Sequence, residues 1–335
     1  MISVITCTGR KDPRFKILAD TIYANLQSID PSGKFLWFEH IVVDMGLWHE
    51  PEYRGQELAD AVKGRFNYKH VAPKPNVWQG PTRLTKSDFY ALCSARNTGL
   101  CCAKFNYIVL FDDCLAADMG WLQWHLQAAR MHIALAGTYE SIKNAKLENG
   151  KVVSYDVLPP SNADHRLSIV GDNPLPVKAP TNWTYGLNVG FPLEAALCIG
   201  GYDEKYDGAG GVEDNDFGIR LGRAGVQVYF SSACKVFQLM DTHDAVCGEI
   251  GGWTGFEGAG KKTRVQKEWL LKDGRMHYAN ERLIEVLYEQ PNRVLPLQGP
   301  NLLMERQRLS EGKGFTIPVE PTRDWRDNQL LVDMA

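Results

Sequence analysis

The chain has 335 residues, of which 44% are hydrophobic and 10% aromatic, so it can bury a sizeable core and is not intrinsically disordered. Its formal net charge of −3 gives no overall signal for binding a polyanion, and no run of about 18 apolar residues predicts a membrane span. The eight cysteines are scattered without a Cys-x-x-Cys pair, which disfavours a disulfide framework or a zinc site and favours a reducing cytoplasm.

The N-terminal part of the chain alternates between strand-like and helix-like patterns. Residues 2–7 (ISVITC) form a short apolar run that becomes polar too soon for a secretory signal, so we expect the first core strand there. The elements predicted in this part, in chain order, are a strand over 2–7, a helix over 14–29, a strand over 35–44, a helix over 85–103, a strand over 107–111, a helix over 119–130 and a strand over 132–136. This alternation predicts an α/β fold with a mostly parallel, Rossmann-like sheet and helices on both faces.

The segment 138–181 breaks this pattern. It loses its periodicity and contains several prolines, with hairpin-like polarity around Glu148-Asn149-Gly150, so we expect a long loop excursion that carries substrate contacts. The elements predicted after it are a strand over 183–191, helices over 192–199 and 213–224, and strands over 226–230 and 234–239. Residues 244–335 are predicted to form a glycine-rich segment and a helical C-terminal appendage.

Polar side chains follow three of the predicted strands. These residues are Thr6, Thr8 and Arg10 in and after the first strand, Asp44 at the end of the second, and Asp112 and Asp113 after the strand 107–111. Because ligands of open α/β sheets bind beyond the carboxyl ends of the strands, we expect these residues to converge on one crevice. Two adjacent carboxylates are costly to bury unless a cation such as Mg²⁺ or Mn²⁺, carrying a diphosphate, neutralises them. The alternative is that Asp112 only caps a turn.

A second cluster of candidate residues lies between 200 and 225. Gly210 and Gly211 permit a close approach of the backbone to a ligand, and Glu213 and Asp214 then begin a helix. Within that helix, Asp216 lies four residues before an arginine with which it can pair. The alternative is a charged first turn without a further role, since a helix N-terminus favours carboxylates.

Taken in order, these motifs resemble the GT-A glycosyltransferases, especially their large inverting family 2. The matching motifs are Thr6 through Arg10, Val43-Asp44, Ala95-Arg96-Asn97-Thr98-Gly99-Leu100, Phe111-Asp112-Asp113-Cys114, Asn188-Val189-Gly190-Phe191, Gly200-Gly201-Tyr202-Asp203-Glu204 and Gly210-Gly211-Val212-Glu213-Asp214. Each motif alone is weak, whereas the set in this order and spacing, over residues 1–240, is specific.

The resemblance implies a metal-dependent, inverting transfer of a hexose-type sugar from a nucleotide diphosphate sugar, with UDP expected as the nucleotide and Mn²⁺ or Mg²⁺ as the metal. It implies a GT-A catalytic domain over 1–243, made of a nucleotide-binding half (1–114), the excursion (138–181) and an acceptor half (182–243), followed by the appendage. The residues that it implies for donor binding are Thr6, Thr8, Arg10, Asp44, Arg96, Asp112, Gly210 and Gly211.

The resemblance also assigns the chemistry to individual residues. Asp214 would be the general base, and Glu213 would hold the acceptor. Asp113 would bind the metal while Asp112 faces the ribose, although this chain has Asp-Asp where many relatives have Asp-x-Asp. The third metal ligand is often a histidine after the last core strand; Gln238 occupies that place, and His243 follows five residues later as our candidate.

The acceptor stays open at this stage. A saccharide or lipid-linked glycan is the default expectation. Residues 63–96 contain seven basic residues against one acid, with aromatic residues among them, a pattern that also occurs in nucleic-acid-binding surfaces. The acceptor could therefore be hydroxymethylated DNA of the kind that phage glycosyltransferases modify. The simpler interpretation is a solvated face with one or two residues that serve the donor diphosphate.

Two other classes of protein remain as alternatives. A nucleotidyltransferase shares the sheet and the metal-binding carboxylates, but it usually has a glycine-rich basic loop after the first strand, and Thr8-Gly9-Arg10 is too short for one. A non-catalytic nucleotide-sugar-binding module has no need of Glu213 and Asp214. The sequence does not indicate the oligomeric state.

Overall fold

The computed structural model describes residues 1–318 except 78, 83–90, 160–162, 172, 174, 208–211 and 242–278. In this part of the chain the strands form one mixed sheet in the order β3-β2-β1-β4-β9-β6-β10-β5, with β7 paired to β6 and β8 to β10. The strands are β1 (Ile2–Thr8), β2 (Phe38–Asp44), β3 (Tyr68–Val71), β4 (Tyr107–Phe111), β5 (Leu115–Ala117), β6 (Ala134–Glu148), β7 (Lys151–Val157), β8 (Val177–Lys178), β9 (Asn188–Pro192) and β10 (Val228–Leu239).

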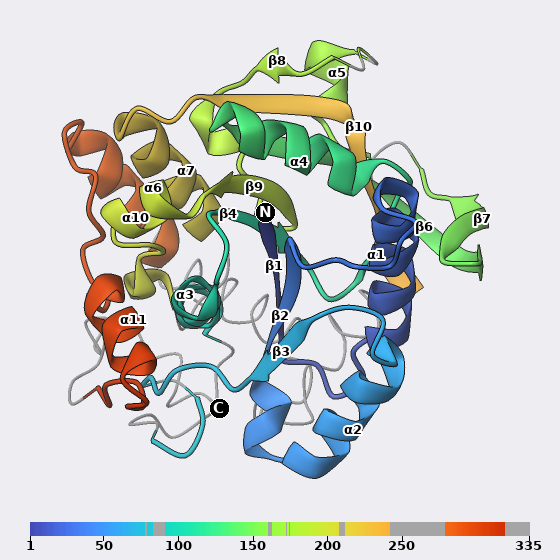
Figure 1. The fold of residues 1–335 in the computed structure, drawn as a ribbon. Coiled ribbons are helices and arrows are strands. Elements are labelled where there is room, and N and C mark those ends of the chain that lie inside the picture. The colour runs from blue at the N-terminus through green and yellow to red at the C-terminus, as the bar shows by residue number, and fades with distance from the viewer. Residues whose placement is uncertain are drawn as a thin grey trace, which may run out of the picture.

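Helices surround this sheet (Figure 1). The α-helices are α1 (Phe15–Ile29), α2 (Pro51–Val62), α3 (Leu92–Cys102), α4 (Trp121–Met131), α5 (Leu167–Val170), α6 (Leu193–Cys198), α7 (Glu213–Arg223), α10 (Ala279–Glu289) and α11 (Leu302–Ser310). Short 3-10 turns are η1 (Met45–Trp48), η3 (Thr181–Trp183) and η4 (Glu204–Tyr206). No helix among the described residues is long and apolar enough to cross a membrane.

The strand directions bring the candidate site to one edge of the sheet. β1 pairs in parallel with β2 and β4, and β2 with β3, so these strands end at the same edge. β9 enters antiparallel between β4 and β6, with Phe111 opposite Asn188, so its amino end meets the carboxyl end of β4. β6 and β10 are parallel again. The predicted fold class, an α/β protein with a mostly parallel central sheet, is confirmed.

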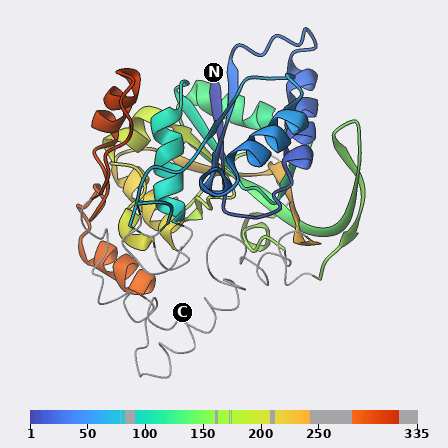
Figure 2. The same ribbon diagram turned by 90° about the horizontal axis from the view of Figure 1, so that it is seen from below.

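Helices cover both faces of the sheet, as Figures 1 and 2 show together. On one face α1, α2 and α4 contribute the buried side chains of Ile22, Leu58 and Trp121 to a core with β1 and β2. On the other face α3 and α7 pack a second core that includes Leu100 and Phe217. α6 and α11 also contribute to this second core. The predicted appendage therefore contacts the sheet domain directly through α11.

Several element boundaries differ from the predictions. β2 begins at Phe38 rather than residue 35, because the amide of Phe38 closes a turn on the carbonyl of Phe35. β9 begins at Asn188 rather than residue 183, since the 3-10 turn η3 occupies the start of the expected strand. The two strands expected over 226–239 form one strand, β10, with a bulge between Ser231 and Lys235. The sequence analysis did not assign α2, β3 or β5.

The segment 138–181 is more regular than expected. β6 continues to Glu148 and forms a hairpin with β7, turning at Asn149 and Gly150, where the φ angles are 51° and 73°. The hairpin turn was predicted, but the absence of strands around it was wrong. The outer half of β6 alternates between half-buried and exposed side chains, and its polar residues weaken the apolar pattern. A Cβ on Gly150 would lie 2.2 Å from the carbonyl oxygen of Asp20 in α1, so the turn requires a glycine there.

Candidate functional site

Asp113 is held at the end of β4 by residues that follow β1. Its carboxylate accepts a hydrogen bond of 2.6 Å from the hydroxyl of Thr8 and one of 2.7 Å from Nε of Arg10. The backbone amide of Arg10 in turn donates to Thr8 Oγ1 over 3.2 Å. The structure thus brings Thr8, Arg10 and Asp113 together, as the sequence analysis predicted for side chains at neighbouring strand ends.

Asp112 lies beside this group but differs from it. Its amide donates to the carbonyl of Leu187, whereas its carboxylate makes no hydrogen bond within the described residues. Burial, together with the negative charges of Asp113 and Glu213, raises the pKa of Asp112 to about 7 against the opposing effect of Arg96 and Arg10. A carboxylate in such surroundings is stabilised by a cation that approaches it.

Arg96 connects this strand-end group to α7. It extends from α3, its Nη1 lies 3.0 Å from Oε1 of Glu213, and both side chains are buried. The guanidinium also lies over the ring of Tyr202, 4.9 Å from the ring centroid. A Cβ on Gly186 would come within 2.0 Å of Arg96 Nη2, so the backbone before β9 passes close to the guanidinium and needs a glycine at this position.

The position of α3 is fixed at both of its ends. Asp207 accepts hydrogen bonds from the amides of Cys93 (2.9 Å) and Ser94 (3.0 Å), which are unpaired donors of the first turn. At the other end, Nη1 of Arg306 in α11 donates to the carbonyls of Leu100, Cys101 and Ala103. The carboxyl group of Asp207 thus satisfies free amides of the first turn, and the cation at the C-terminus complements the helix dipole. These remote side chains position the helix that carries Arg96.

Asn97, the neighbour of Arg96, fixes the Gly200-Gly201-Tyr202 turn. Its side-chain amide donates to the carbonyl of Tyr202 over 2.9 Å and accepts from the amide of Tyr202 over 2.8 Å. Gly201 has a φ of 70°, and a Cβ there would lie 2.4 Å from Asn97 Oδ1. The two motifs therefore pack against each other as one unit.

Asp214 stands in the first turn of α7, after Glu213. One carboxylate oxygen accepts from the amide of Gly186 (3.1 Å) and the other from the amide of Asn215 (2.8 Å). Burial and the adjacent charge of Glu213 raise the pKa of Asp214 to about 6, while Arg96 and the two amides lower it. Asp214 is thus more basic than an ordinary aspartate and still mostly ionised at neutral pH.

Thr6 and Asp44 have partners away from this group. Thr6 is fully buried and its hydroxyl lies 2.9 Å from Nε2 of His40. Asp44 is fully buried as well, and it pairs with the guanidinium of Arg54 (3.0 Å), with His70 Nε2 (2.9 Å) and with the amide of Gly46 (2.8 Å). Their assignment to the donor pocket stays a prediction.

Some predicted residues fall outside the described part of the chain: Gly210, Gly211 and His243. Gln238, at the first place considered for a third metal ligand, accepts a hydrogen bond from the hydroxyl of Ser141 over 3.1 Å. Among the described residues, no three His, Cys, Asp or Glu side chains are grouped so that they could hold a metal by themselves. The described site thus offers the two carboxylates at the end of β4 as oxygen ligands.

Two residues important for this arrangement were missed. Gly186 received no role because a single glycine before a strand has many explanations. Arg54 lies on the same helical stripe as the buried residues Leu58, Ala61 and Val62. A cation at that position on an apolar stripe is a signal that a buried acid faces it.

The chain is similar to known proteins in sequence and in structure. No protein-family model matches the chain. The chondroitin synthase of Escherichia coli is 30% identical over 218 residues, which cover 58% of this chain and 29% of the synthase, so the chain spans less than a third of this relative's length. A solved structure of GalNAc-T7 with UDP, GalNAc and Mn²⁺ aligns with a TM-score of 0.46 and 14% identity over 71% of this chain and 43% of that one. The sequence similarity to the synthase confirms the predicted resemblance.

Proposed function

We propose that this chain, a glycosyltransferase of the GT-A type, moves a hexose-type sugar from a UDP-sugar to an acceptor hydroxyl with inversion, using Asp214 as the general base. The observation that carries the proposal is the grouping of two acidic pairs around Arg96: Asp112 with Asp113 at the end of β4, and Glu213 with Asp214 at the start of α7. The first pair can hold the metal ion that accompanies the donor diphosphate, and the second can accept the proton of the attacking hydroxyl.

In the proposed reaction, Asp214 takes the proton of the acceptor hydroxyl as the hydroxyl oxygen attacks the anomeric carbon. The bond between that carbon and the diphosphate oxygen breaks, and the electron pair leaves with the nucleoside diphosphate. A single displacement from the opposite side inverts the configuration. The amides of Gly186 and Asn215 fix the orientation of the Asp214 carboxylate, and its raised pKa improves it as a proton acceptor.

Asp112 and Asp113 would hold Mn²⁺ or Mg²⁺. The carboxylate of Asp112 fits this role because it is half-buried and has no hydrogen-bond partner in the described residues, and hard cations prefer carboxylate oxygens. When bound, the divalent ion offsets the charge that develops on the leaving diphosphate. Arg10 already pairs with Asp113, which leaves this arginine close enough to contact the same phosphates. His243 remains the proposed third ligand.

A saccharide is the proposed acceptor, in line with the name of the synthase relative. Hydroxymethylated DNA is less well supported by the contacts of residues 63–96. Four of the bases that suggested it are paired with acids from other elements: Arg65 with Asp20, Lys69 with Glu39, Lys74 with Glu204, and Arg96 with Glu213. The local excess of +6 in sequence is therefore largely neutralised in space. We also propose a cytoplasmic location, because the cysteines in the described ranges are free.

The proposal is tested with a panel of nucleotide sugars, each incubated with Mn²⁺ or Mg²⁺ and without acceptor. We expect metal-dependent hydrolysis of a UDP-hexose, abolished by EDTA, and transfer once an oligosaccharide acceptor is added. Release of pyrophosphate from a nucleoside triphosphate and a sugar phosphate would instead identify a nucleotidyltransferase. Donor binding without any turnover would identify a binding module. Gel shifts over a salt series test the DNA acceptor, since phosphate contacts make affinity fall by about 0.9 log units per log unit of salt for each phosphate.

A further inference from the structure

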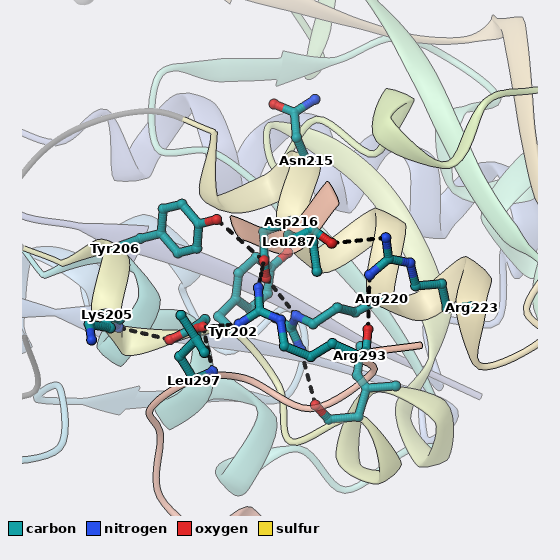
Figure 3. Close-up of polar contacts among 12 residues, drawn as sticks. Tyr202, Lys205, Tyr206, Asn215, Asp216, Arg220, Arg223, Leu287, Arg293 and Leu297 are labelled. Carbon is teal, nitrogen blue, oxygen red and sulfur yellow. Dashed lines mark hydrogen bonds and ion pairs between the residues drawn. The ribbon is translucent and has the colours of Figure 1, made fainter. Parts of the chain in front are cut away.

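The C-terminal arm, residues 287–298, lies against the helix that carries the proposed base. Arg223, at the end of α7, donates from Nη1 to the carbonyls of Gln290 (3.0 Å) and Arg293 (3.1 Å) and from Nη2 to the carbonyl of Leu287 (3.1 Å). Figure 3 labels Arg223 and Leu287 among the polar contacts of this cluster. The arm is therefore attached to the last turn of α7 by three hydrogen bonds.

Arg293 of the same arm reaches the first half of α7. Its Nη2 lies 3.3 Å from Oδ2 of Asp216, and its Nη1 lies 3.7 Å from Oδ2 of Asp203 (Figure 3). Both carboxylates are fully buried. Asp203 also accepts hydrogen bonds from the amides of Leu297 (2.6 Å) and Gln298 (3.1 Å), so the arm and the turn before η4 are joined by backbone contacts as well.

The fully buried charges of this cluster need the arm for their balance. Two fully buried carboxylates, Asp203 and Asp216, face one fully buried cation of α7, Arg220, whose Nε pairs with Asp216, whereas Arg223 of the same helix is only half-buried. Burial raises the pKa of Asp203, and the charge of Asp216 raises it further. An unpaired buried carboxylate is strongly unfavourable, so the second cation, Arg293, decides whether α7 and the turn at Asp203 can lie this close together.

The cluster lies directly behind the proposed catalytic groups. Asp216 is two residues after Asp214 in the same helical turn. Asp203 follows Tyr202, whose backbone is held by Asn97, the neighbour of Arg96. A shift of α7 relative to this turn would thus change the distance between the Arg96–Glu213 pair and the amide of Gly186 that orients Asp214.

We propose that Arg293 is a positioning residue for the transfer reaction, which places α7 so that Asp214 meets the acceptor hydroxyl. This inference rests on the proposed function. Nε and Nη1 of Arg293 are buried and make no hydrogen bond to the described residues. The guanidinium therefore acts mainly through its charge, and a lysine at this position should restore most of its effect.

The test compares Arg293→Met, Arg293→Lys and the control Arg308→Met. Arg308 is an arginine of α11 whose Nε donates to the carbonyl of Gly314, away from α7. For Arg293→Met we expect kcat to fall about 10- to 100-fold, as for a misplacement of about 1 Å, while the donor Kd stays within about threefold. Arg293→Lys should recover at least about a third of the parent kcat, and Arg308→Met should match the parent.

A second measurement separates this inference from the proposed function. Hydrogen–deuterium exchange of the α7 amides should become about tenfold faster in Arg293→Met, with exchange in β1 and β4 unchanged, whether or not the parent protein transfers a sugar. If the parent protein is inactive but shows this exchange pattern, the proposed function is contradicted, whereas the placement of α7 by Arg293 is supported. A kcat within about twofold of the parent for Arg293→Met, or equal losses of kcat, donor affinity and protection throughout the sheet, would overturn the positioning role.

Discussion

Asp44 is a fully buried acid at the end of β2, Asp214 is a half-buried acid in the first turn of α7, and the partners of their carboxylates differ. Asp44 has the guanidinium of Arg54, an imidazole and a backbone amide around it. Asp214 has two backbone amides and an acidic neighbour that raises its pKa. A fully paired carboxylate has nothing left to offer a substrate, whereas one held only by amides keeps its capacity to accept a proton. On the basis of these partners we propose a catalytic role for Asp214 and expect a structural one for Asp44.

The largest effect is expected for Asp214→Asn. The change keeps the shape and the hydrogen bond from Gly186 but removes the proton acceptor, so transfer should fall about 10²- to 10⁴-fold while donor affinity is retained. Single-turnover assays and calorimetry with the UDP-sugar measure the two quantities. Near-normal turnover would remove Asp214 from the mechanism and direct attention to Glu213 or Asp216.

The same variant should lose activity but gain stability. Because the folded-state pKa of Asp214 is raised, its ionised form opposes folding, and this cost is present above about pH 6 and disappears as the carboxylate becomes protonated at lower pH. Asp214→Asn should therefore raise the melting temperature at pH 8 and change it little at pH 4. A lower melting temperature at pH 8 would contradict this assignment of the charge.

Asp44→Asn should have its main effect on stability. The change removes the fully buried acidic partner of Arg54, which keeps its ion pair with the partly exposed Glu57, and the loss of a buried ion pair costs about 3–5 kcal/mol. Urea unfolding measures it, with the exposed Asp60→Asn in α2 as a control that should change stability by less than about 0.5 kcal/mol. If the Asp44→Asn protein stays stable but binds the donor more weakly, the structural role of Asp44 is contradicted and the donor role that the resemblance implies is supported.

Asp112→Asn and Asp113→Asn should both weaken metal-dependent donor binding, by at least about tenfold. They should differ in stability. Asp113 pairs with Arg10, so its loss destabilises the fold, whereas Asp112 is penalised by its own burial and its loss should not. Calorimetry with Mn²⁺ and with EDTA, beside thermal unfolding, gives both quantities. Unchanged donor affinity in both variants would show that these carboxylates hold no cation.

The smallest predicted effect is a displacement of the pH profile. The base works when deprotonated, so kcat should fall about tenfold per pH unit below about pH 6 rather than below about pH 4. Glu213→Gln removes a negative charge that raises this pKa, and the acid limb should move to lower pH. The profiles are measured at saturating donor. If the acid side of the kcat–pH profile is the same in Glu213→Gln as in the parent, the pKa that controls kcat belongs to another group.

The sequence predicted the sheet because apolar runs such as 107–111 are continuous and end abruptly at acids. It predicted that Asp216 and Arg220 pair, because four-residue spacing is a property of any helix, and the pair is present. It could not predict that Asp44 pairs with Arg54 and His70. That pairing depends on the direction of one side chain at a strand end, which neither spacing nor composition encodes.

The contacts of the C-terminal arm could not be predicted from the sequence either. Arg293 lies 77 residues after Asp216, and no local pattern relates the two. The same holds for the basic excess of residues 63–96, since the acids that pair with Lys69 and Lys74 come from distant parts of the chain. Charge counts along a sequence describe a surface only when the charges find no partner inside the fold.

The two ends of α3 bear on the order in which the molecule is built. Its first turn is completed by Asp207 and its last turn by Arg306, 114 and 205 residues later than their partners Cys93 and Cys101. A nascent chain on the ribosome can pair β1, β2 and β4 early, but Arg96 acquires its final setting only after α11 has been synthesised. Long-range contacts of this kind form late in folding. We therefore expect the growing chain to have a formed sheet well before it has a working site, so that unfinished chains do not consume nucleotide sugar.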